Sequence, residues 1–275
     1  MKTKLNSEFK WHILLGIFVI ISLFPIIFAI SSSFKSLGEA YNNVLGIIPN
    51  EPTLNNYIEV FKRLPFVNIT GNTFFIATMV TLFKVTTSVL AAYAFVYFDF
   101  KYKNILYFIM ISTIFIPFTV TMIPNYLTIS QLGLRDSLLG VILPQLSDAT
   151  GIFLLRQSMR TIPKSLIEVT ELENINHFKR MRDIIVPMVK PSIISTGIMF
   201  FINSWNEYVW PVLILKTKEN FTLPLALQLF ISAEGGTDFT IAMAVSVITM
   251  IIPLILYIIF QKHIIDTFTS SGIKG

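Results

Sequence analysis

Residues 165–191 read SLIEVTELENINHFKRMRDIIVPMVKP and form the longest charged stretch of a chain that is otherwise largely apolar. The stretch lies between two apolar runs, so it must form a sizeable loop or a small helical unit at a membrane surface. Apolar residues recur in it at helical spacing on both sides of Asn174, which suits a turn: Val169, Leu172 and Ile175 first, then Phe178, Met181 and Ile184. The pattern predicts a helix, a turn and a second helix that together form a docking unit.

The start of this unit carries a helix-capping signal. Ser165 and Glu168 have the spacing of a capping box, in which two side chains satisfy backbone N–H groups at a helix N-terminus. Pro163 just upstream suits a chain that is about to enter a helix. Glu168 is therefore a helix cap, a docking residue or both, since the two roles are compatible.

Composition identifies the broad class of protein. Of 275 residues 53% are hydrophobic and only 13% are charged, and apolar runs of about 20 residues, long enough to cross roughly 30 Å of hydrocarbon, recur along the chain. The first run follows three lysines, as in a secretory signal, but it is too long for one and is read as an uncleaved helix. We expect an all-α integral membrane protein of one domain, residues 1–275, with six transmembrane helices near 11–30, 74–98, 105–123, 137–155, 193–215 and 241–260.

Lysine and arginine in the connecting segments set the orientation. With the N-terminus inside, fourteen of these residues lie in inner segments and six in outer ones, while Lys84 lies within a span. Both termini and the loop 156–190 are then predicted to be cytoplasmic. This uneven distribution also accounts for the net charge of +5 without nucleic acid.

The residues for catalysis are missing from the sequence. It contains no phosphate-binding G-x-x-x-x-G-K-[ST] motif, no HExxH and no Ser/His/Asp set. Cysteine is absent, and the three histidines show no metal-ligand spacing. We therefore expect no enzyme activity and no cofactor in this chain.

A polar cluster interrupts the predicted fifth span, where residues 203–211 read NSWNEYVWP. Amides and carboxylates in a membrane helix are costly unless they face protein or water, so they are candidates for a solute path. Asn203, Asn206 and Glu207 share one face of a continuous helix, while Trp205 points away and should pack against a neighbouring helix. For Tyr208 and Trp210, an aromatic belt at the membrane interface is an equally good explanation.

Two charged or polar sites lie in other spans. Lys84 in the second span should pair with a carboxylate or carbonyl, or extend its ammonium to the interface. Attraction of an anionic substrate is an alternative role for it. The fourth span contains Pro144, Gln145 and Asp148, and should be shielded from lipid by other helices.

The 165–191 segment also resembles a known loop. Permease subunits of ABC importers carry E-A-A, two residues, D-G-A, eight residues and I-x-[LV]-P. Here the matching positions read EVT at 168–170, ENI at 173–175 and IIVP at 184–187, with the same spacing. Asn174 replaces the usual glycine, and asparagine is a common substitute where φ is positive. Bulkier residues replace alanine at Val169, Thr170 and Ile175.

Further stretches are similar to the carbohydrate-uptake branch of these importers. W-N-x-Y-x-x-P at 205–211 looks like its fifth-helix motif, and the short stretches 90–95, 153–157, 242–244 and 271–275 agree in order. The likeness is greatest to the second permease of maltose-, arabino-oligosaccharide- and glycerol-3-phosphate-type systems. It covers nearly the whole chain.

The resemblance implies a function and partners. The chain would form half of a translocation path in a bacterial cell membrane, with a homologous permease, a dimer of ATPase subunits that use ATP and Mg, and an extracytoplasmic solute-binding protein. The residues implied in ATPase coupling are Glu168, Val169, Thr170, Glu173, Asn174, Ile175, Phe178 and Pro187. Those expected to line the path are Asn203, Asn206, Glu207 and Tyr208.

Three alternatives stay open. The solute is a carbohydrate or, in the same role, sn-glycerol-3-phosphate or another polyol phosphate. An ion-coupled secondary transporter would need buried acids at the membrane midplane, for which only Glu207 is a candidate. A membrane scaffold would leave the polar fifth span without a purpose.

Overall fold

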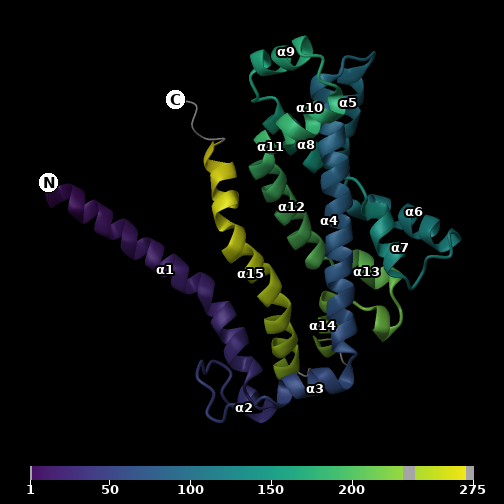
Figure 1. Ribbon diagram of the computed structural model, residues 1–275. Helices are drawn as coiled ribbons and strands as arrows, with labels where there is room; N and C mark the ends of the chain where they lie inside the picture. The colour runs from purple at the N-terminus through teal and green to yellow at the C-terminus, as the bar shows by residue number, and fades with distance from the viewer. Residues whose placement is uncertain (1, 232–238, 271–275) are drawn as a thin grey trace. The chain divides into compact units, whose positions relative to one another are not determined.

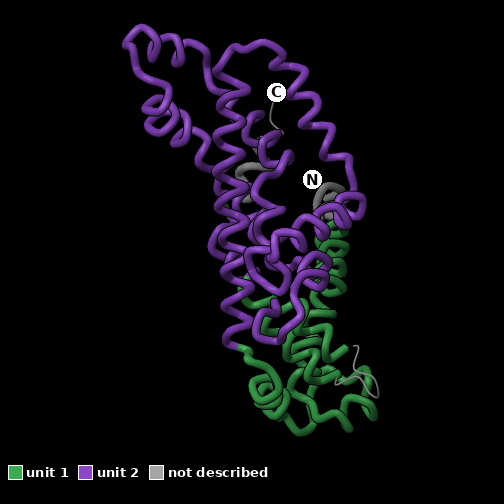
Figure 2. Tube along the Cα trace, turned by 90° about the vertical axis from the view of Figure 1, so that its right-hand side faces the viewer, with its two compact units in different colours: residues 1–66, 223–252 green, residues 67–222, 253–275 purple. Residues whose placement is uncertain are grey.

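The computed structural model describes residues 2–231 and 239–270, and all regular structure within these ranges is helical (Figure 1). The chain divides into two compact units, coloured in Figure 2. One contains Met1–Phe66 and Leu223–Ile252, and the other contains Val67–Thr222 and Pro253–Gly275. The tail 271–275, which contributed to the family resemblance, lies outside the described residues.

The first unit is organised around a buried asparagine. Its helices are α1 (Lys2–Ser33), α2 (Leu37–Asn42), α3 (Asn55–Arg63), α14 (Leu223–Ile231) and the first part of α15 (Phe239–Ser270). Asn56 donates to the carbonyls of Ser33 and Lys35, both at 2.8 Å, and its own oxygen accepts from Thr240 at 3.0 Å. These bonds join the end of α1 to α3 and α15.

The second unit carries the residues that the sequence analysis singled out. Its central helices are α4 (Phe66–Tyr97), α8 (Ala149–Met159) and α12 (Lys190–Trp205). Further ones are α5 (Lys103–Ser112), α6 (Phe118–Gln131), α7 (Leu138–Ile142), α9 (Lys164–Leu172), α10 (His177–Arg180), α11 (Val186–Met188) and α13 (Val209–Ile214). α8 packs closely on α4 and α12, because a Cβ atom on Gly151 would come within 2.5 Å of Ser88 Oγ and 2.6 Å of the Phe200 ring.

Three helical segments are long and apolar enough to cross a membrane: Phe9–Ser33, Phe66–Tyr97 and Phe239–Gln261. Three further candidates are bent pairs, in which two helices meet at an angle above 40°. The described residues therefore provide between three and six spans.

The predicted third transmembrane helix, 105–123, is not one continuous helix. α5 passes into a 3-10 turn at Thr113–Phe115, and the chain then turns by 98° into α6. Pro117 lies at the break with ψ 140°, and Ile116 before it is extended with ψ 113°. Proline lacks an N–H and disfavours a helical residue before it, which explains the break.

Two other predicted helices are also broken. The fourth bends by 46° between a 3-10 turn containing Pro144 and the start of α8, which Asp148 caps. The fifth stops at Trp205 and restarts at Val209. Hydropathy registers the apolar length of such segments but not a local loss of helical hydrogen bonds.

Candidate functional site

The coupling segment, defined here as residues 164–188, is a helix, a turn and a second helical stretch, as predicted. α9 ends at Leu172, and Asn174 adopts φ +53°, the left-handed conformation that asparagine tolerates better than most residues. The chain re-enters a helix at His177 and continues through a π-turn, Met181–Ile185, into α11. In Figure 1 the segment lies at the C-terminal end of α4.

The predicted capping box is wrong. Pro163 occupies the N-cap position of α9 and makes no side-chain cap bond, so Ser165 falls inside the helix. With Pro163 before it, the helix begins at Lys164, one residue upstream of the serine, since the fixed φ of proline favours entry into a helix. Glu168 is exposed in α9, so its helix-cap explanation loses its support.

An apolar surface is exposed on the coupling segment. Leu172 is 82% exposed, Phe178 65% and Val169 49%. Thr170 is buried and Ile175 half-buried, whereas Glu168, Glu173, Asn174 and Pro187 are exposed. Apolar side chains displayed on a charged loop indicate a surface that a partner covers.

Polar contacts fix the segment to α4. The hydroxyl of Tyr93 lies 3.1 Å from His177 Nδ1 and donates to the His177 carbonyl at 3.2 Å, while the His177 ring stacks on Phe98 at 4.2 Å. Arg180, only 4% exposed in its side chain, pairs with Glu171 at 3.2 Å and thereby links α10 to α9.

A hydrophobic cluster lies beneath these contacts. It joins α4 and α8 to the end of the coupling segment through Ala92, Tyr93, Leu155, Met159, Ile162, Ile185 and Val189. Tyr97 adds a hydrogen bond from its hydroxyl to the Met159 carbonyl at 3.1 Å. The segment therefore has a rigid base and an exposed apolar tip.

The fifth-span break, residues 206–208, lies between α12 and α13. Asn206 is the C-cap of α12, and its amide donates to the Ile202 carbonyl at 2.9 Å. Glu207 Oε1 accepts from the backbone N–H of Trp210 at 3.2 Å and so caps α13. Trp205 is fully buried and stacks with Phe201 at 5.8 Å, which confirms that it packs inside the unit.

The placement of three polar residues on one continuous helix face is wrong, because α12 ends at Trp205 with Asn206 as its C-cap, and Glu207 lies in the break before α13. Asn203 lies in α12 and is exposed, as is Asn206, whereas Glu207 and Tyr208 are half-buried in the break. Their role in a solute path stays a prediction.

Lys84 has the carboxylate partner that its position in the membrane requires. Its ammonium lies 3.1 Å from Asp148 Oδ2 and 5.2 Å from the centre of the Phe200 ring. The other oxygen of Asp148 accepts the N–H groups of Thr150 at 2.9 Å and Gly151 at 3.4 Å. One aspartate thus neutralises a cation and caps α8.

Several structural links were missed by the sequence analysis. Opposite charges in two apolar spans were a usable signal for the pair of Lys84 and Asp148. By contrast, nothing in the sequence connects Tyr93 to His177, 84 positions away. Within residues 2–231 and 239–270, no group of three His, Asp or Glu side chains could hold a metal ion.

Comparison with known proteins shows close full-length relatives. The chain is 29% identical to the arabinooligosaccharides transport system permease protein AraQ of Halalkalibacterium halodurans, with 100% of each chain covered. It is also 29% identical to the sn-glycerol-3-phosphate transport system permease protein UgpE of Rhizobium meliloti, with 93% of this chain and 94% of that protein covered.

Among solved structures, the fold is similar to a bacterial ABC transporter involved in the import of the acidic polysaccharide alginate. The TM-score is 0.84 at 24% identity, over 95% of this chain and 98% of that one. A second alginate ABC transporter structure, in complex with an alginate pentasaccharide-bound periplasmic protein, gives a TM-score of 0.70 at 13% identity and covers 94% of each chain.

Residues 84–269 match the family described as the binding-protein-dependent transport system inner membrane component. The match contains both the coupling segment and the fifth-span break. The chain is a member of this family of inner membrane transport components.

Proposed function

We propose that this chain is the permease subunit of an ATP-driven, binding-protein-dependent importer of a carbohydrate. The observation that carries the proposal is the exposed apolar tip of the coupling segment, held on a rigid base, in a chain of this family. The permease would pair with a homologous permease, two ATPase subunits and an extracytoplasmic solute-binding protein, and ATP with Mg would be used by the ATPase.

The coupling step follows from the contacts of the segment. Val169, Leu172 and Phe178 enter a cleft of the ATPase and lose their exposed apolar area. When the cleft opens or closes, the displacement passes through the bonds of Tyr93 with His177 and through the buried cluster to α4 and α8. A loosely attached loop would absorb the same displacement.

We propose one permease domain with six spans and both termini in the cytoplasm. The bent pairs over 103–131 and 138–159 would supply two of the remaining spans, and Lys190–Trp205 the third, because the stretch paired with it, His177–Met188, belongs to the coupling segment. Fourteen cationic residues on one side against six on the other support the orientation. A reporter fused at the C-terminus should read cytoplasmic, and one inserted after Lys218 should read external. The opposite result would remove the coupling segment from the ATP-containing side.

The solute is proposed from the relatives. Arabinooligosaccharides and sn-glycerol-3-phosphate are named in two relatives of equal 29% identity, so a polyol phosphate is the second candidate. Uptake of labelled arabino-oligosaccharides and of labelled glycerol phosphate, measured with and without the gene for this chain, separates the two. Dependence on an ion gradient but not on ATP would instead indicate a secondary transporter.

Two substitutions test the docking surface. Leu172→Asp and Glu168→Lys each place an unfavourable charge on it and should abolish ATP-dependent uptake and co-purification of the ATPase. Both residues are exposed, so the amount of permease in the membrane should not fall.

Leu132→Asp is the matched control, because Leu132 is 62% exposed but lies after α6, away from the coupling segment. It should leave ATPase binding intact. Normal ATPase co-purification and uptake with Leu172→Asp would contradict the proposal.

A further inference from the structure

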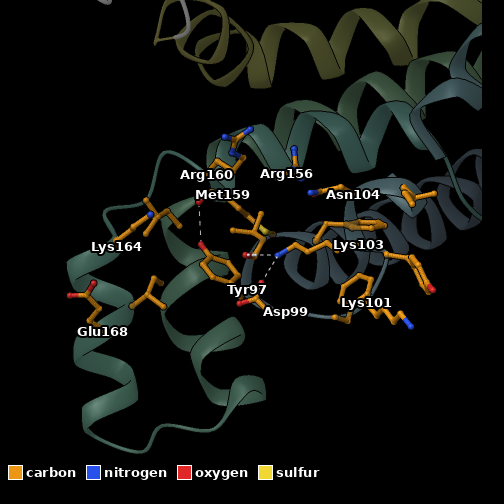
Figure 3. A pocket seen from close by; sticks show the side chains of 17 residues that line it. Tyr97, Asp99, Lys101, Lys103, Asn104, Arg156, Met159, Arg160, Lys164 and Glu168 are labelled. Carbon is orange, nitrogen blue, oxygen red and sulfur yellow. Dashed lines mark hydrogen bonds and ion pairs between the residues drawn. The ribbon is translucent and has the colours of Figure 1, made fainter. Parts of the chain in front are cut away.

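A large cavity adjoins the coupling segment but not its exposed apolar tip. It has a volume of about 1230 Å³ and lies between the α4–α5 turn, the end of α8 and the start of α9 (Figure 3). Five cations line it, against the two carboxylates Asp99 and Glu168: Lys101, Lys103, Arg156, Arg160 and Lys164. The excess of positive charge suits an anion.

Most of these cations have no acidic partner. Lys103 pairs with Asp99 at 3.5 Å and donates to the Phe98 carbonyl at 2.6 Å. Among the residues that the structure describes, no ion pair forms at the other four: Lys101, Arg156, Arg160 and Lys164. In Figure 3 the Lys101 side chain points away from the other labelled cations, which leaves the two arginines and Lys164 as the main anion donors.

Arg156 shows the strongest sign of a missing ligand. Its guanidinium lies 3.8 Å from the centre of the Tyr107 ring, which fixes its plane. Its Nε and the Tyr107 hydroxyl are both buried without a hydrogen-bond partner in the described part of the chain. No carboxylate in the described part of the chain pairs with this half-buried guanidinium, so its position at the cavity wall favours an anion from outside the chain.

The surroundings of the cavity favour an amphiphilic anion. Apolar α4 ends at Tyr97 and apolar α5 begins at Lys103, so in the six-span topology proposed above the cations would lie at the level of the lipid headgroups. Phe100 is 41% and Ile105 56% exposed beside them. A cationic cavity with apolar walls at this level matches a phosphate headgroup with its acyl chains.

We propose that this cavity binds the phosphodiester headgroup of an anionic phospholipid, with Arg156 and Arg160 as its principal donors. Planar guanidinium groups bind phosphate oxygens through paired N–H donors. The bound lipid would brace the α4–α5 turn against the base of the coupling segment. This site adjoins the proposed ATPase docking surface and shares Glu168 with it, but of α9 only Lys164, Ile167 and Glu168 line the cavity, and the apolar tip residues Leu172 and Val169 do not.

The test measures lipid binding directly. The full-length chain, purified in uncharged detergent, is titrated with fluorescent short-chain phosphatidylglycerol and, separately, phosphatidylcholine. We expect phosphatidylglycerol to bind at least about tenfold more tightly. Arg160→Gln should weaken it about fivefold and the double variant Arg156→Gln/Arg160→Gln at least about tenfold, as expected for losing one and two cations at a membrane surface.

Lys190→Gln is the matched control, since Lys190 is exposed and lies outside the cavity. It should bind phosphatidylglycerol as the unmodified chain does. Arg160 is exposed, so its substitution tests the site even if the double variant fails to fold. Unchanged binding in Arg160→Gln, or equal binding of the two lipids, would overturn the proposal. Full displacement by inorganic phosphate below about 1 mM would overturn the lipid assignment and reassign the cations to free phosphate.

Discussion

The coupling segment and the fifth-span break distribute polarity in opposite ways. On the coupling segment, Leu172 and Phe178 are exposed while the charged Arg180 is buried. At the break, Trp205 and Trp210 are buried, whereas the amides of Asn203 and Asn206 are exposed. The coupling segment therefore exposes apolar side chains, which water disfavours. The residues around the break expose amides, which hydrocarbon would disfavour.

The difference indicates what must cover each region. Exposed leucine and phenylalanine on a charged loop call for an apolar cleft on another protein. Exposed amides in a membrane-spanning segment call for water, a polar solute or another protein. The same unit thus contains both the proposed docking surface and the candidate path, and substitutions that are matched between the regions can separate these two proposed roles.

The largest change in stability is expected when a buried aromatic ring is removed. Removal of an exposed apolar side chain gives the comparison. Trp205→Ala removes a fully buried ring and should lower the stability of the assembled permease by roughly 3–5 kcal/mol. Leu172→Ala removes a side chain that is 82% exposed and should change stability by less than about 0.5 kcal/mol. Thermal unfolding of the purified protein measures both. A stable Trp205→Ala variant would place that ring outside the core.

The second-largest change in stability is expected at Asp136, which binds the loop that follows α13. Asp136 Oδ1 accepts the N–H groups of Lys216 at 2.8 Å and Thr217 at 3.1 Å. Burial acts to raise the pKa of Asp136, but these two backbone bonds and the Asn220 amide lower it below its ordinary 3.8. Asp136→Asn should cost up to about 2 kcal/mol at pH 6, since it replaces charge-assisted bonds with neutral ones.

The sign of this pH dependence follows from the lowered pKa. A carboxyl group whose pKa falls on folding stabilises the protein above its unfolded pKa, and the contribution is lost as pH falls through its folded pKa. The stability difference between the unmodified chain and Asp136→Asn should therefore be constant above about pH 5 and shrink below about pH 4. A difference that does not change down to pH 2 would show that the charge of Asp136 contributes nothing.

The sequence predicted the coupling segment better than the fifth span, for a physical reason. Helical spacing and a turn residue are local properties, and they correctly gave α9, the left-handed Asn174 and α10. The breaks at Pro117 and after Trp205 are changes in backbone conformation that the apolar composition of the segment does not record. Proline signals a possible break, but apolar runs alone make such a segment look continuous.

The contacts that attach the coupling segment could not be predicted. Tyr93 and His177 are both amphipathic and suit many environments, so only the folded chain identifies them as partners. Lys84 was different, because an isolated cation among apolar residues requires a counter-charge, and Asp148 was the acid within the apolar spans nearest to it in the chain. A pairing between two side chains could be predicted from the sequence only where leaving one of them unpaired would be costly, as for a lysine within an apolar span.

The third substitution tests whether the attachment of the coupling segment to α4, and not only its docking to the ATPase, transmits the motion of the ATPase. Tyr93→Phe removes the hydroxyl bonded to His177 and should cost about 1 kcal/mol of stability. The ATPase should still bind, but solute-stimulated ATP hydrolysis should fall several-fold because the loop moves more independently of α4. Tyr97→Phe is the matched control, since its hydroxyl binds Met159 of α8 and not the segment. Equal losses in the two variants would indicate a general loosening.

The smallest change in stability is expected at the fifth-span break, where it should separate from function. Asn206→Ala removes an exposed amide that, among the described residues, hydrogen-bonds only to the nearby Ile202 carbonyl, so the assembled complex should lose less than about 0.5 kcal/mol. If Asn206 contacts the solute, uptake should nevertheless fall several-fold or change its solute preference. Glu207→Gln removes the charge of Glu207 but keeps an oxygen that can accept the Trp210 N–H. Glu207→Ala removes both the charge and this hydrogen bond. Solute-dependent uptake by the three variants, at equal amounts of complex, distinguishes the roles: a defect in Glu207→Ala alone would make these residues structural caps and remove them from the path.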